Sequence, residues 1–416
     1  MNLVSGSPLT ARWHDQLAPT CAALFIIGSL ATIPYAAPPA TWYMVLLAIV
    51  AAFVVFCGRF DRMKRWESVV IWPIWVLLGA WGISIATSGA PEISMLRSAS
   101  MLLFSILFIA AQIAGWNERA LRTVIIGIVG TMLVCVLDLA WQKWTGRSLI
   151  QGLDAASSAN AGSQGNRNDL AVVSVLLPFS SVLIRGGNGL FLYLILAAAS
   201  SPAWILSASR QTGLGWVIAV IGPFAARTSR RIAFAFSGIL LAIFLVVVAS
   251  SASLQQRAIQ TWRGGLAERQ EIIAFGAHLF WQHPLTGVGT GMYGAHYRDA
   301  AIKNWSWNGR ALPKVGMPWV HSLPIEVLCE TGLVGAAAIL AILSGTIRRL
   351  RSSICIGGTE RELAIAISTA LVVVLLIGLI DFSFVKDWFR CTWWLILGLA
   401  FANGHKSSLL RSPKTD

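Results

Sequence analysis

The chain is a succession of long apolar runs separated by short clusters of charged residues. The runs are about 17 to 25 residues long, the length that a helix needs to cross roughly 30 Å of hydrocarbon. They are continuously apolar and do not alternate with polar residues, which favours helices over the strands of a membrane barrel. The pattern therefore predicts an all-α membrane protein of about twelve transmembrane helices, centred near Ile27, Leu47, Val76, Ile106, Ile128, Leu176, Leu194, Val217, Ile243, Ala336, Val373 and Leu395.

One long polar stretch, residues 251–320, interrupts this succession. It separates a first part with nine predicted helices, residues 1–250, from a last part with three helices and a polar tail, residues 321–416. Between Trp204 and Gly215 a broken helix is an alternative to a continuous one. Within the polar stretch we expect short amphipathic helices, the first of them packed on the membrane bundle, because apolar residues recur there at helical spacing, as at Ile272, Phe275, Leu279 and Phe280.

The composition excludes an ordinary soluble domain, which carries about 25% charged residues. This chain is 56% hydrophobic and 12% charged, with a mean hydropathy of +0.69. The first run resembles a signal peptide, but it lacks a clear small-residue cleavage site, so we interpret it as a retained helix. The six cysteines form no CxxC pair, which argues against a metal site or a disulfide framework. The glycines of residues 287–291 lack the Lys-Ser/Thr ending of a phosphate-binding loop, so we expect no nucleotide site. We also expect no nucleic-acid partner.

Orientation follows from Lys and Arg in the short loops, because these residues are concentrated on the cytoplasmic side. With twelve helices, both termini share one face with the most basic loops, which hold Arg59, Arg62, Lys64, Arg65, Arg119, Arg122, Arg185, Arg227, Arg230, Arg231, Arg348, Arg349 and Arg351. This face should be cytoplasmic, and residues 251–320 should be external. Long loops cross a membrane whatever their charge. Even so, a site for a phosphorylated substrate is suggested by the seven basic residues of this stretch, Arg257, Arg263, Arg269, Arg298, Lys303, Arg310 and Lys314.

Arg210 lies between two apolar runs with little loop around it. A charge at the edge of the hydrocarbon costs a few kcal/mol unless it reaches water or a partner, so such a residue is a functional candidate. A planar guanidinium binds two phosphate oxygens at once and stays charged. The alternative is an arginine that merely extends to the interface. We favour a phosphate-binding role.

Arg269 lies in the first turn of the predicted amphipathic helix, an unfavourable place for a cation because it faces the positive end of the helix dipole. A guanidinium beside the free N–H groups of a helix start would make an anion site. The alternative is an ion pair with Glu268 or Glu271, and the sequence does not decide between the two.

His321 directly precedes the tenth predicted helix. Histidine titrates near neutral pH and can therefore take or release a proton during a reaction. A lone histidine at an interface is more often structural, and this alternative stays open. The histidines at 278, 283 and 296 lack HExxH-like spacing and have few carboxylates nearby, so we expect no metal site.

Three segments, taken together and in order, resemble the O-antigen ligase and polymerase superfamily. Residues 207–210 (SASR) resemble the short Ser-x-Ser-Arg segment of the family. Residues 283–289 (HPLTGVG) resemble the stretch that follows the first helix of its large loop. Residues 321–335 resemble the ligase signature, in which His plus Ser or Asn precedes a membrane helix, with Ile325 in place of the usual Leu. The motifs cover roughly residues 166–335, and the topology covers the whole chain.

The resemblance implies a glycosyltransferase of the bacterial inner membrane whose active site faces the periplasm. Such enzymes take a glycan from undecaprenyl diphosphate, and in a ligase they place it on the lipid A–core oligosaccharide. Both substrates are lipid-anchored and would arrive laterally among the membrane lipids. In the family, arginines hold the diphosphate and a histidine acts near the acceptor hydroxyl, without a metal or other cofactor. Carried over by motif, these residues are Arg210, Arg269 and His321.

Three further residues are candidates for the same external site: Arg263, Asp381 and Arg390. The sequence does not say whether the last external loop, which also holds Lys386 and Asp387, joins it. No carboxylate is evidently placed to trap a covalent intermediate, so we expect a single displacement with inversion.

An O-antigen ligase is the leading hypothesis. A polymerase or a protein O-oligosaccharyltransferase of the same superfamily is the first alternative, although the external basic residues and the His-Ser pair modestly favour the ligase. A transporter or flippase is the alternative from another class. It would need ionisable groups near the middle of the bilayer, where the acidic candidates are Asp138 and Asp381, and we expect both of them nearer a helix end.

Overall fold

The computed structural model describes residues 8–31, 33, 70–115, 117–150, 152, 154, 167–183, 189–251, 255, 267–314, 317–381 and 383–409. These residues are mostly α-helical, in agreement with the predicted fold class. The predicted helix around Leu47, the basic loop Arg59–Arg65 and the candidate Arg263 lie outside the described residues.

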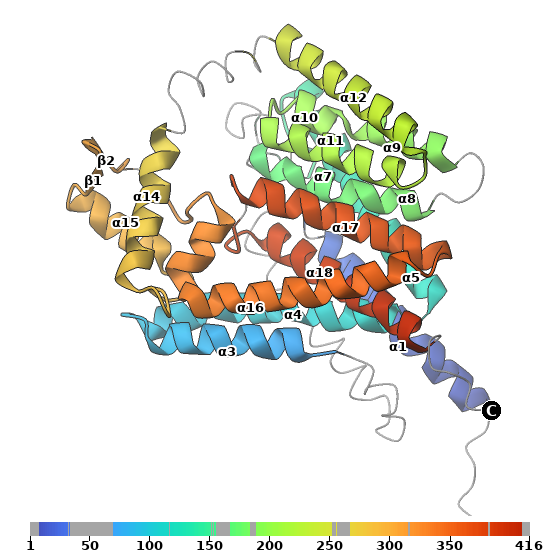
Figure 1. Cartoon of the computed structure of the whole chain (residues 1–416), viewed down its shortest axis with the longest axis horizontal. Helices are drawn as coiled ribbons and strands as arrows, with labels where there is room; N and C mark the ends of the chain where they lie inside the picture. The colour runs from blue at the N-terminus through green and yellow to red at the C-terminus, as the bar shows by residue number, and fades with distance from the viewer. Residues whose placement is uncertain are drawn as a thin grey trace, which may run out of the picture.

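The first helices form one side of the bundle (Figure 1): α1 (Pro8–Ala31), α3 (Trp72–Ala86), α4 (Pro91–Ala114) and α5 (Glu118–Thr145). Proline stands in the first turn of α3 and α4, where its missing N–H leaves no donor unsatisfied. The side chain of Asn117 caps α5, and Gly146, at φ +83°, ends it. α1 packs against α4 and α5.

A buried run of short helical pieces follows: η3 (Arg167–Leu170), α7 (Ala171–Leu176), η4 (Leu177–Phe179) and α8 (Ser180–Leu183). Pro178 lies in η4, where the run changes from α- to 3₁₀-geometry because proline cannot donate the helical hydrogen bond. The chain continues through α9 (Gly189–Ser200), α10 (Pro202–Ile205), α11 (Arg210–Ala225) and α12 (Arg230–Ser250). The helix is broken between α10 and α11, as one of the two sequence interpretations allowed.

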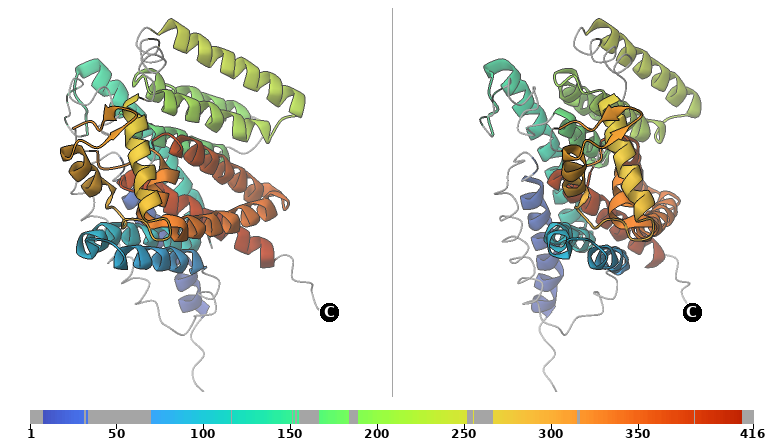
Figure 2. Two further views of the ribbon diagram at one scale, coloured as in Figure 1. Left: turned by 60° about the vertical axis from the view of Figure 1, so that its left-hand side comes forward. Right: turned by 90° about the vertical axis from the view of Figure 1, so that its left-hand side faces the viewer.

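A small unit lies at one end of the bundle (Figures 1 and 2): α14 (Ala267–Gln282), α15 (Tyr293–Ile302), β1 (Ser306–Trp307) and β2 (Arg310–Ala311). It has its own core, to which Ile272, Phe275 and Leu279 contribute, so the predicted apolar face of the first loop helix is buried. The antiparallel strands were not predicted. They are joined at Asn308 (φ +49°) and Gly309 (φ +75°), the positive-φ pair that a tight hairpin turn requires.

The last three helices run through the middle of the molecule: α16 (Leu323–Ile354), α17 (Gly358–Gly378) and α18 (Asp387–Leu409). α16 packs on α3, α14, α17 and α18, and α17 also packs on α11. α12 stands at the edge, where it packs on α11 and is mostly exposed (Figure 2).

The helices are those of a membrane protein. Helices occur at every predicted centre that falls among the described residues. Four of them, α5, α12, α16 and α17, are long and apolar enough to cross a membrane. The total of twelve spans stays a prediction. The loop before α11, the start of α16 and the α17–α18 loop meet at the end of the bundle that carries α14 and α15.

Candidate active site

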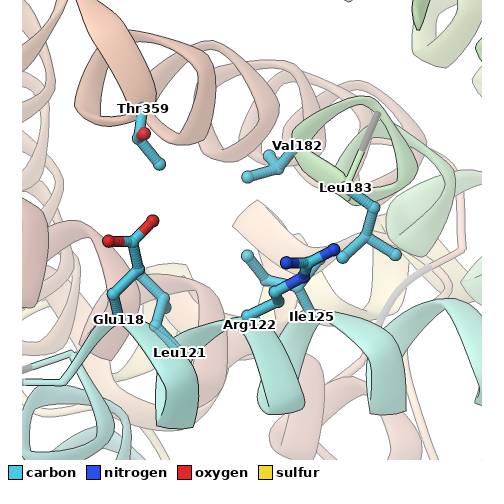
Figure 3. A pocket seen from close by; sticks show the side chains of 7 residues that line it. All are labelled: Glu118, Leu121, Arg122, Ile125, Val182, Leu183 and Thr359. Atoms are coloured by element: carbon cyan, nitrogen blue, oxygen red, sulfur yellow. The ribbon is translucent and has the colours of Figure 1, made fainter. Parts of the chain in front are cut away.

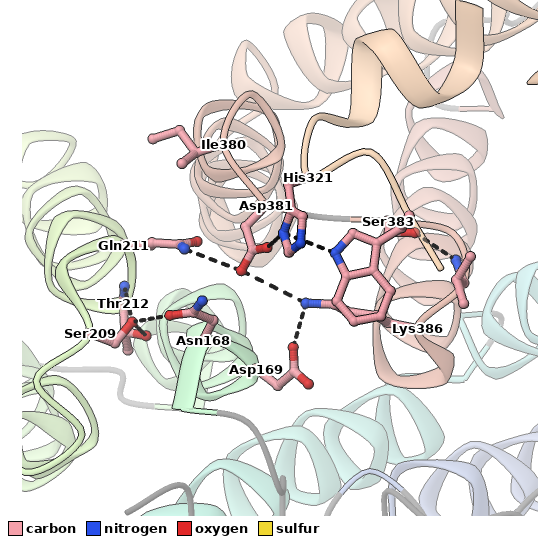
Figure 4. A network of polar contacts seen from close by, with 12 residues as sticks. Asn168, Asp169, Ser209, Gln211, Thr212, His321, Ile380, Asp381, Ser383 and Lys386 are labelled. Atoms are coloured by element: carbon pink, nitrogen blue, oxygen red, sulfur yellow. Dashed lines mark hydrogen bonds and ion pairs between the residues drawn. The ribbon is translucent and has the colours of Figure 1, made fainter. Parts of the chain in front are cut away.

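A network of polar side chains joins the loops at this end of the bundle (Figure 4). His321 comes from the segment before α16, Asp381 and Lys386 come from the α17–α18 loop, and Asp169 comes from η3. All four side chains are largely buried, with exposed fractions between 2% and 14%. Segments far apart in the sequence therefore contribute charged groups to one site.

The His321 Nδ1 atom lies 2.6 Å from Asp381 Oδ1. The Trp319 Nε1 atom lies 3.1 Å from the same ring nitrogen, and both contacts cannot be hydrogen bonds at once. An ionised carboxylate only accepts, so the shorter contact requires the proton on Nδ1. The Nε2 atom of neutral His321 is then left with its lone pair, in the form that a general base needs.

Asp381 is ionised under ordinary conditions. Burial alone would raise the pKa of this carboxyl group, but the Lys386 ammonium, the hydrogen bond from His321 and the charge of Arg269 outweigh burial and lower it to about 2. The carboxylate therefore holds the imidazole in one tautomer and would stabilise its protonated form.

Lys386 carries the positive charge in the centre of the network. Its Nζ atom lies 2.6 Å from Asp169 Oδ1, 3.8 Å from Asp381 Oδ2 and 4.9 Å from the centre of the Trp319 indole ring. Burial lowers the pKa of the ammonium, but the two carboxylates outweigh burial and raise it above its ordinary value. The ammonium thus stays charged and compensates both carboxylates.

Arg210 and Arg269 lie at the edge of this network. Arg210 begins α11 and is exposed, and its neighbour Gln211 donates to Asp381 Oδ2 over 3.1 Å. Arg269, in the first turn of α14, donates from Nη1 to the carbonyl of Ile380, beside Asp381, over 3.1 Å. The two guanidiniums are near enough for their charges to repel each other. Such a pair is suited to an anion.

Neither arginine forms an ion pair with a carboxylate among the described side chains. Glu271, one of the two partners considered for Arg269, lies 3.7 Å from Arg310 instead. The described residues offer the Arg210 guanidinium neither an ion pair nor a hydrogen bond. Both guanidiniums therefore keep donor groups for a ligand.

Arg390 supports the backbone of the α17–α18 loop. Its guanidinium donates to the carbonyl oxygens of Phe384 and Val385, and Nη1 lies 3.2 Å from Asp387. These contacts hold the backbone that carries Lys386. These contacts do not include His321 or Asp381, so the part of Arg390 in the reaction stays a prediction.

The backbone is strained at two points beside the site. Among the described non-glycine residues with positive φ, two are asparagines, which tolerate this conformation. The other two are Ala208 (φ +51°), two residues before Arg210, and His321 itself (φ +59°). Such conformations cost of order 1–3 kcal/mol each and persist only where the surroundings impose them. The fold thus fixes both residues in unfavourable backbone geometry at the network.

Two glycines hold α14, and with it Arg269, against the start of α16. Gly332 (φ +62°) breaks α16, and a Cβ atom there would lie 2.3 Å from the carbonyl oxygen of Leu285. Gly287 (φ +70°) would likewise place a Cβ atom 2.2 Å from the carbonyl carbon of Glu330. The two segments exchange backbone hydrogen bonds at this crossing, among them Val288 N to Cys329 O and Leu333 N to Pro284 O, both 2.9 Å. We call this the glycine crossing.

Sequence reasoning missed Asp169 and did not decide the role of Lys386. The predicted orientation placed Lys386 in the last external loop, and this was the signal available for it. The ion pair between them joins residues 217 positions apart, a distance over which no sequence pattern operates. Among the described residues, no group of three or more His, Cys, Asp or Glu side chains is placed to hold a metal ion, and independence from metals stays a prediction.

Comparison with known proteins gave one family assignment. No curated protein matched the chain. Residues 188–340 match the family model described as O-antigen ligase. This span includes Arg210, Arg269 and His321, whereas Asp169, Asp381 and Lys386 lie outside it. Over this span the chain is similar to the O-antigen ligase family, which supports membership of that superfamily.

Proposed function

We propose that this protein transfers O-antigen glycan from undecaprenyl diphosphate to the lipid A–core oligosaccharide, on the periplasmic face of the bacterial inner membrane. The observation that carries the proposal is the contact of 2.6 Å between His321 and Asp381, next to the pair of arginines at 210 and 269. A base with a fixed tautomer and an anion-binding pair are the two groups that this reaction needs.

The arginines would hold the diphosphate of the donor. Breaking the bond between the anomeric carbon and the phosphate oxygen leaves the electron pair, and hence negative charge, on undecaprenyl diphosphate. Guanidiniums already in place stabilise this charge without a metal ion. Arg210 is exposed and has no carboxylate partner in the described structure, so it is the stronger candidate for direct contact with phosphate.

His321 would take the proton of the acceptor hydroxyl. A sugar hydroxyl is too weak an acid to ionise by itself, so a base must remove the proton as the oxygen attacks the anomeric carbon. The proton would move to Nε2, and the adjacent Asp381 carboxylate would stabilise the resulting imidazolium. Asp381 acts in this scheme as a positioning residue for His321.

A single displacement with inversion fits this arrangement. A double displacement needs a carboxylate that attacks the anomeric carbon. The Asp381 side chain is only 2% exposed and accepts from both His321 and Gln211, which leaves it poorly placed for attack. The products would be the glycosylated acceptor and free undecaprenyl diphosphate.

A polymerase of the same superfamily is the second candidate, since it would use the same donor and the same type of base. It differs in its acceptor, a second lipid-linked repeat. A flippase is less compatible with the site, because the His321–Asp381 pair lies at the end of the bundle, beside the loop helix α14.

Deletion of the gene in its host tests the proposal. We expect lipopolysaccharide with a bare core, together with accumulated polymerised lipid-linked glycan. Complementation with the parental gene, or with the exposed control variant Arg298→Ala on α15, should restore lipopolysaccharide that carries O-antigen. Complementation with His321→Ala should not. A core that carries a single repeat would point to the polymerase. Normal lipopolysaccharide after deletion would contradict both assignments.

A further inference from the structure

A cavity lies at the end of the bundle opposite the candidate site, between α5, α8 and α17 (Figure 3). Its volume is about 270 Å³. The helical run that begins at Asp169, in the candidate site, ends at Leu183, in the wall of this cavity. At ~1.5 Å per residue the two residues are roughly 20 Å apart. The cavity is therefore separate from the site described above, at the face predicted to be cytoplasmic.

The cavity combines an apolar wall with three polar side chains. The apolar part consists of Leu121, Ile125, Val182 and Leu183. In Figure 3 the Arg122 guanidinium and the Glu118 carboxylate point into the cavity from α5, and the hydroxyl of Thr359 faces them from α17. The wall thus offers a cation, an anion and an aliphatic surface to one ligand.

The Arg122 guanidinium has unused donors. Among the described residues it makes no ion pair and no side-chain hydrogen bond. Phosphate is the group that a guanidinium binds best, through two parallel N–H···O contacts. Thr359 lies in the first turn of α17, whose free N–H groups also favour an anion.

The apolar wall and the Glu118 carboxylate favour one class of ligand, a phospholipid whose headgroup carries an ammonium group. A free phosphate ion would leave the four aliphatic side chains without a partner, whereas a phospholipid would cover them with its glycerol and acyl groups. α5 is one of the helices long and apolar enough to cross the membrane, so lipid headgroups are available at its end. Glu118 would repel an acidic headgroup and would attract an ammonium group.

We propose that the cavity between α5, α8 and α17 binds the headgroup of a phosphoethanolamine lipid, with its phosphate against Arg122 and Thr359 and its ammonium against Glu118. This lipid would fasten the cytoplasmic ends of the three helices together. The proposal is independent of the reaction at the opposite face.

Native mass spectrometry of the full-length protein in detergent tests the assignment. Dioleoyl-phosphatidylethanolamine, -phosphatidylglycerol and -phosphatidylcholine are added singly at equal concentrations. We expect the ethanolamine lipid to give the most abundant adduct. Arg122→Gln should reduce this adduct at least fivefold. Arg119→Gln, an exposed cation on the same helix outside the cavity wall, should leave it unchanged. Glu118→Gln should remove the preference for the ethanolamine lipid over the glycerol lipid.

Three results would overturn the proposal. Equal adducts in Arg122→Gln and the parent would show that the lipid binds elsewhere, provided that both melt at similar temperatures. If Arg122→Gln does not fold, Arg122→Lys replaces it and should lose at least half of the adduct. A phosphatidylglycerol adduct as strong as the ethanolamine adduct in the parent would exclude the role of Glu118. Displacement of the lipid by an equal concentration of soluble O-phosphoethanolamine would assign the cavity to a soluble ligand.

Discussion

At the scale of single residues, Asp381 is where the three residues singled out in the sequence meet. Its carboxylate contacts His321 and also accepts from Gln211, the residue after Arg210. Arg269 donates to the carbonyl of Ile380, the residue before Asp381. One short segment thus brings together the chain regions that carry the proposed base and the two arginines.

Arg210→Lys should lose most of the transfer activity although the charge is kept. An ammonium is a point charge and cannot reproduce contacts to two phosphate oxygens. A lost charge-assisted hydrogen bond is worth about 1.5–3 kcal/mol, so the rate should fall roughly 10- to 100-fold. The measurement is glycan transfer by purified protein at saturating acceptor. Arg298→Lys is the matched control, and a parental rate in Arg210→Lys would remove Arg210 from the diphosphate site.

His321→Ala should abolish transfer and still bind the lipid-linked donor, because donor contacts are assigned to the arginines. Asp381 should keep its charge, and with it the tautomer of His321, over the ordinary assay range of pH. Its lowered pKa means that its stabilising charge is lost only as the pH drops towards about 2.

Glycan transfer and donor binding, measured for His321→Ala and for the parent, check this prediction. Loss of donor binding in His321→Ala, or transfer at the parental rate, would move His321 to a structural role.

The sequence predicted the residues of the site that carry a local signal. Arg210 stood out as a charge at a membrane edge, and His321 stood out at the start of an apolar run. Asp169 gave no such signal, because its importance comes only from the Lys386 ammonium that the fold brings to 2.6 Å. Buried ion pairs between distant segments depend on tertiary structure and are invisible to spacing rules.

At the scale of elements, the Lys386–Asp169 ion pair ties η3 to the α17–α18 loop. Lys386→Met should leave two buried carboxylates without their cation, a change that typically costs about 3–5 kcal/mol. We expect a lower melting temperature in detergent and loss of activity. The double variant Lys386→Met/Asp169→Asn should recover part of the stability. Equal melting temperatures of the single variant and the parent would show that the ion pair does not stabilise the fold.

A substitution in the glycine crossing should destabilise the protein more than the same substitution at an exposed glycine. Gly332→Ala adds a Cβ atom at φ +62°, 2.3 Å from a backbone oxygen, so the crossing must open. We expect destabilisation of about 2 kcal/mol or more, since backbone atoms cannot move aside easily. Gly238→Ala, in α12, meets no atom within 4 Å and should be neutral or slightly stabilising. Thermal unfolding of the two variants in the same detergent compares them.

Helices were predicted correctly where a single apolar pattern extends over a long run of residues. The prediction was less complete where the backbone changes its geometry within a few residues. The Asn308-Gly309 pair is a hairpin signal that sequence reasoning passed over, because the flanking strands are only two residues each. The break at Gly332 depends on the segment from Pro284 to Gly289 that docks there, so the helix pattern of α16 alone does not reveal it.

At the scale of the whole molecule, the predicted orientation assigns the two ends of the bundle to different compartments. A single cysteine at Asn308, in the hairpin turn, should react with a membrane-impermeant maleimide in intact spheroplasts. A cysteine at Thr228, between α11 and α12, should react only after lysis. Both variants are made in a background without the native cysteines. Labelling of Asn308→Cys only after lysis would reverse the orientation and move the candidate site to the cytoplasm.

The glycine crossing also has a consequence for protein engineering. It is built from backbone atoms, and it affects the candidate site only by fixing where α14 and the start of α16 lie. Such a joint is indifferent to which sugar or acceptor is used. A library that seeks a new acceptor should therefore keep Gly287 and Gly332 constant and vary the exposed side chains of the hairpin, which lie outside the joint. The parts of the family signature that are easiest to find in a sequence would then be the parts that a designer leaves alone.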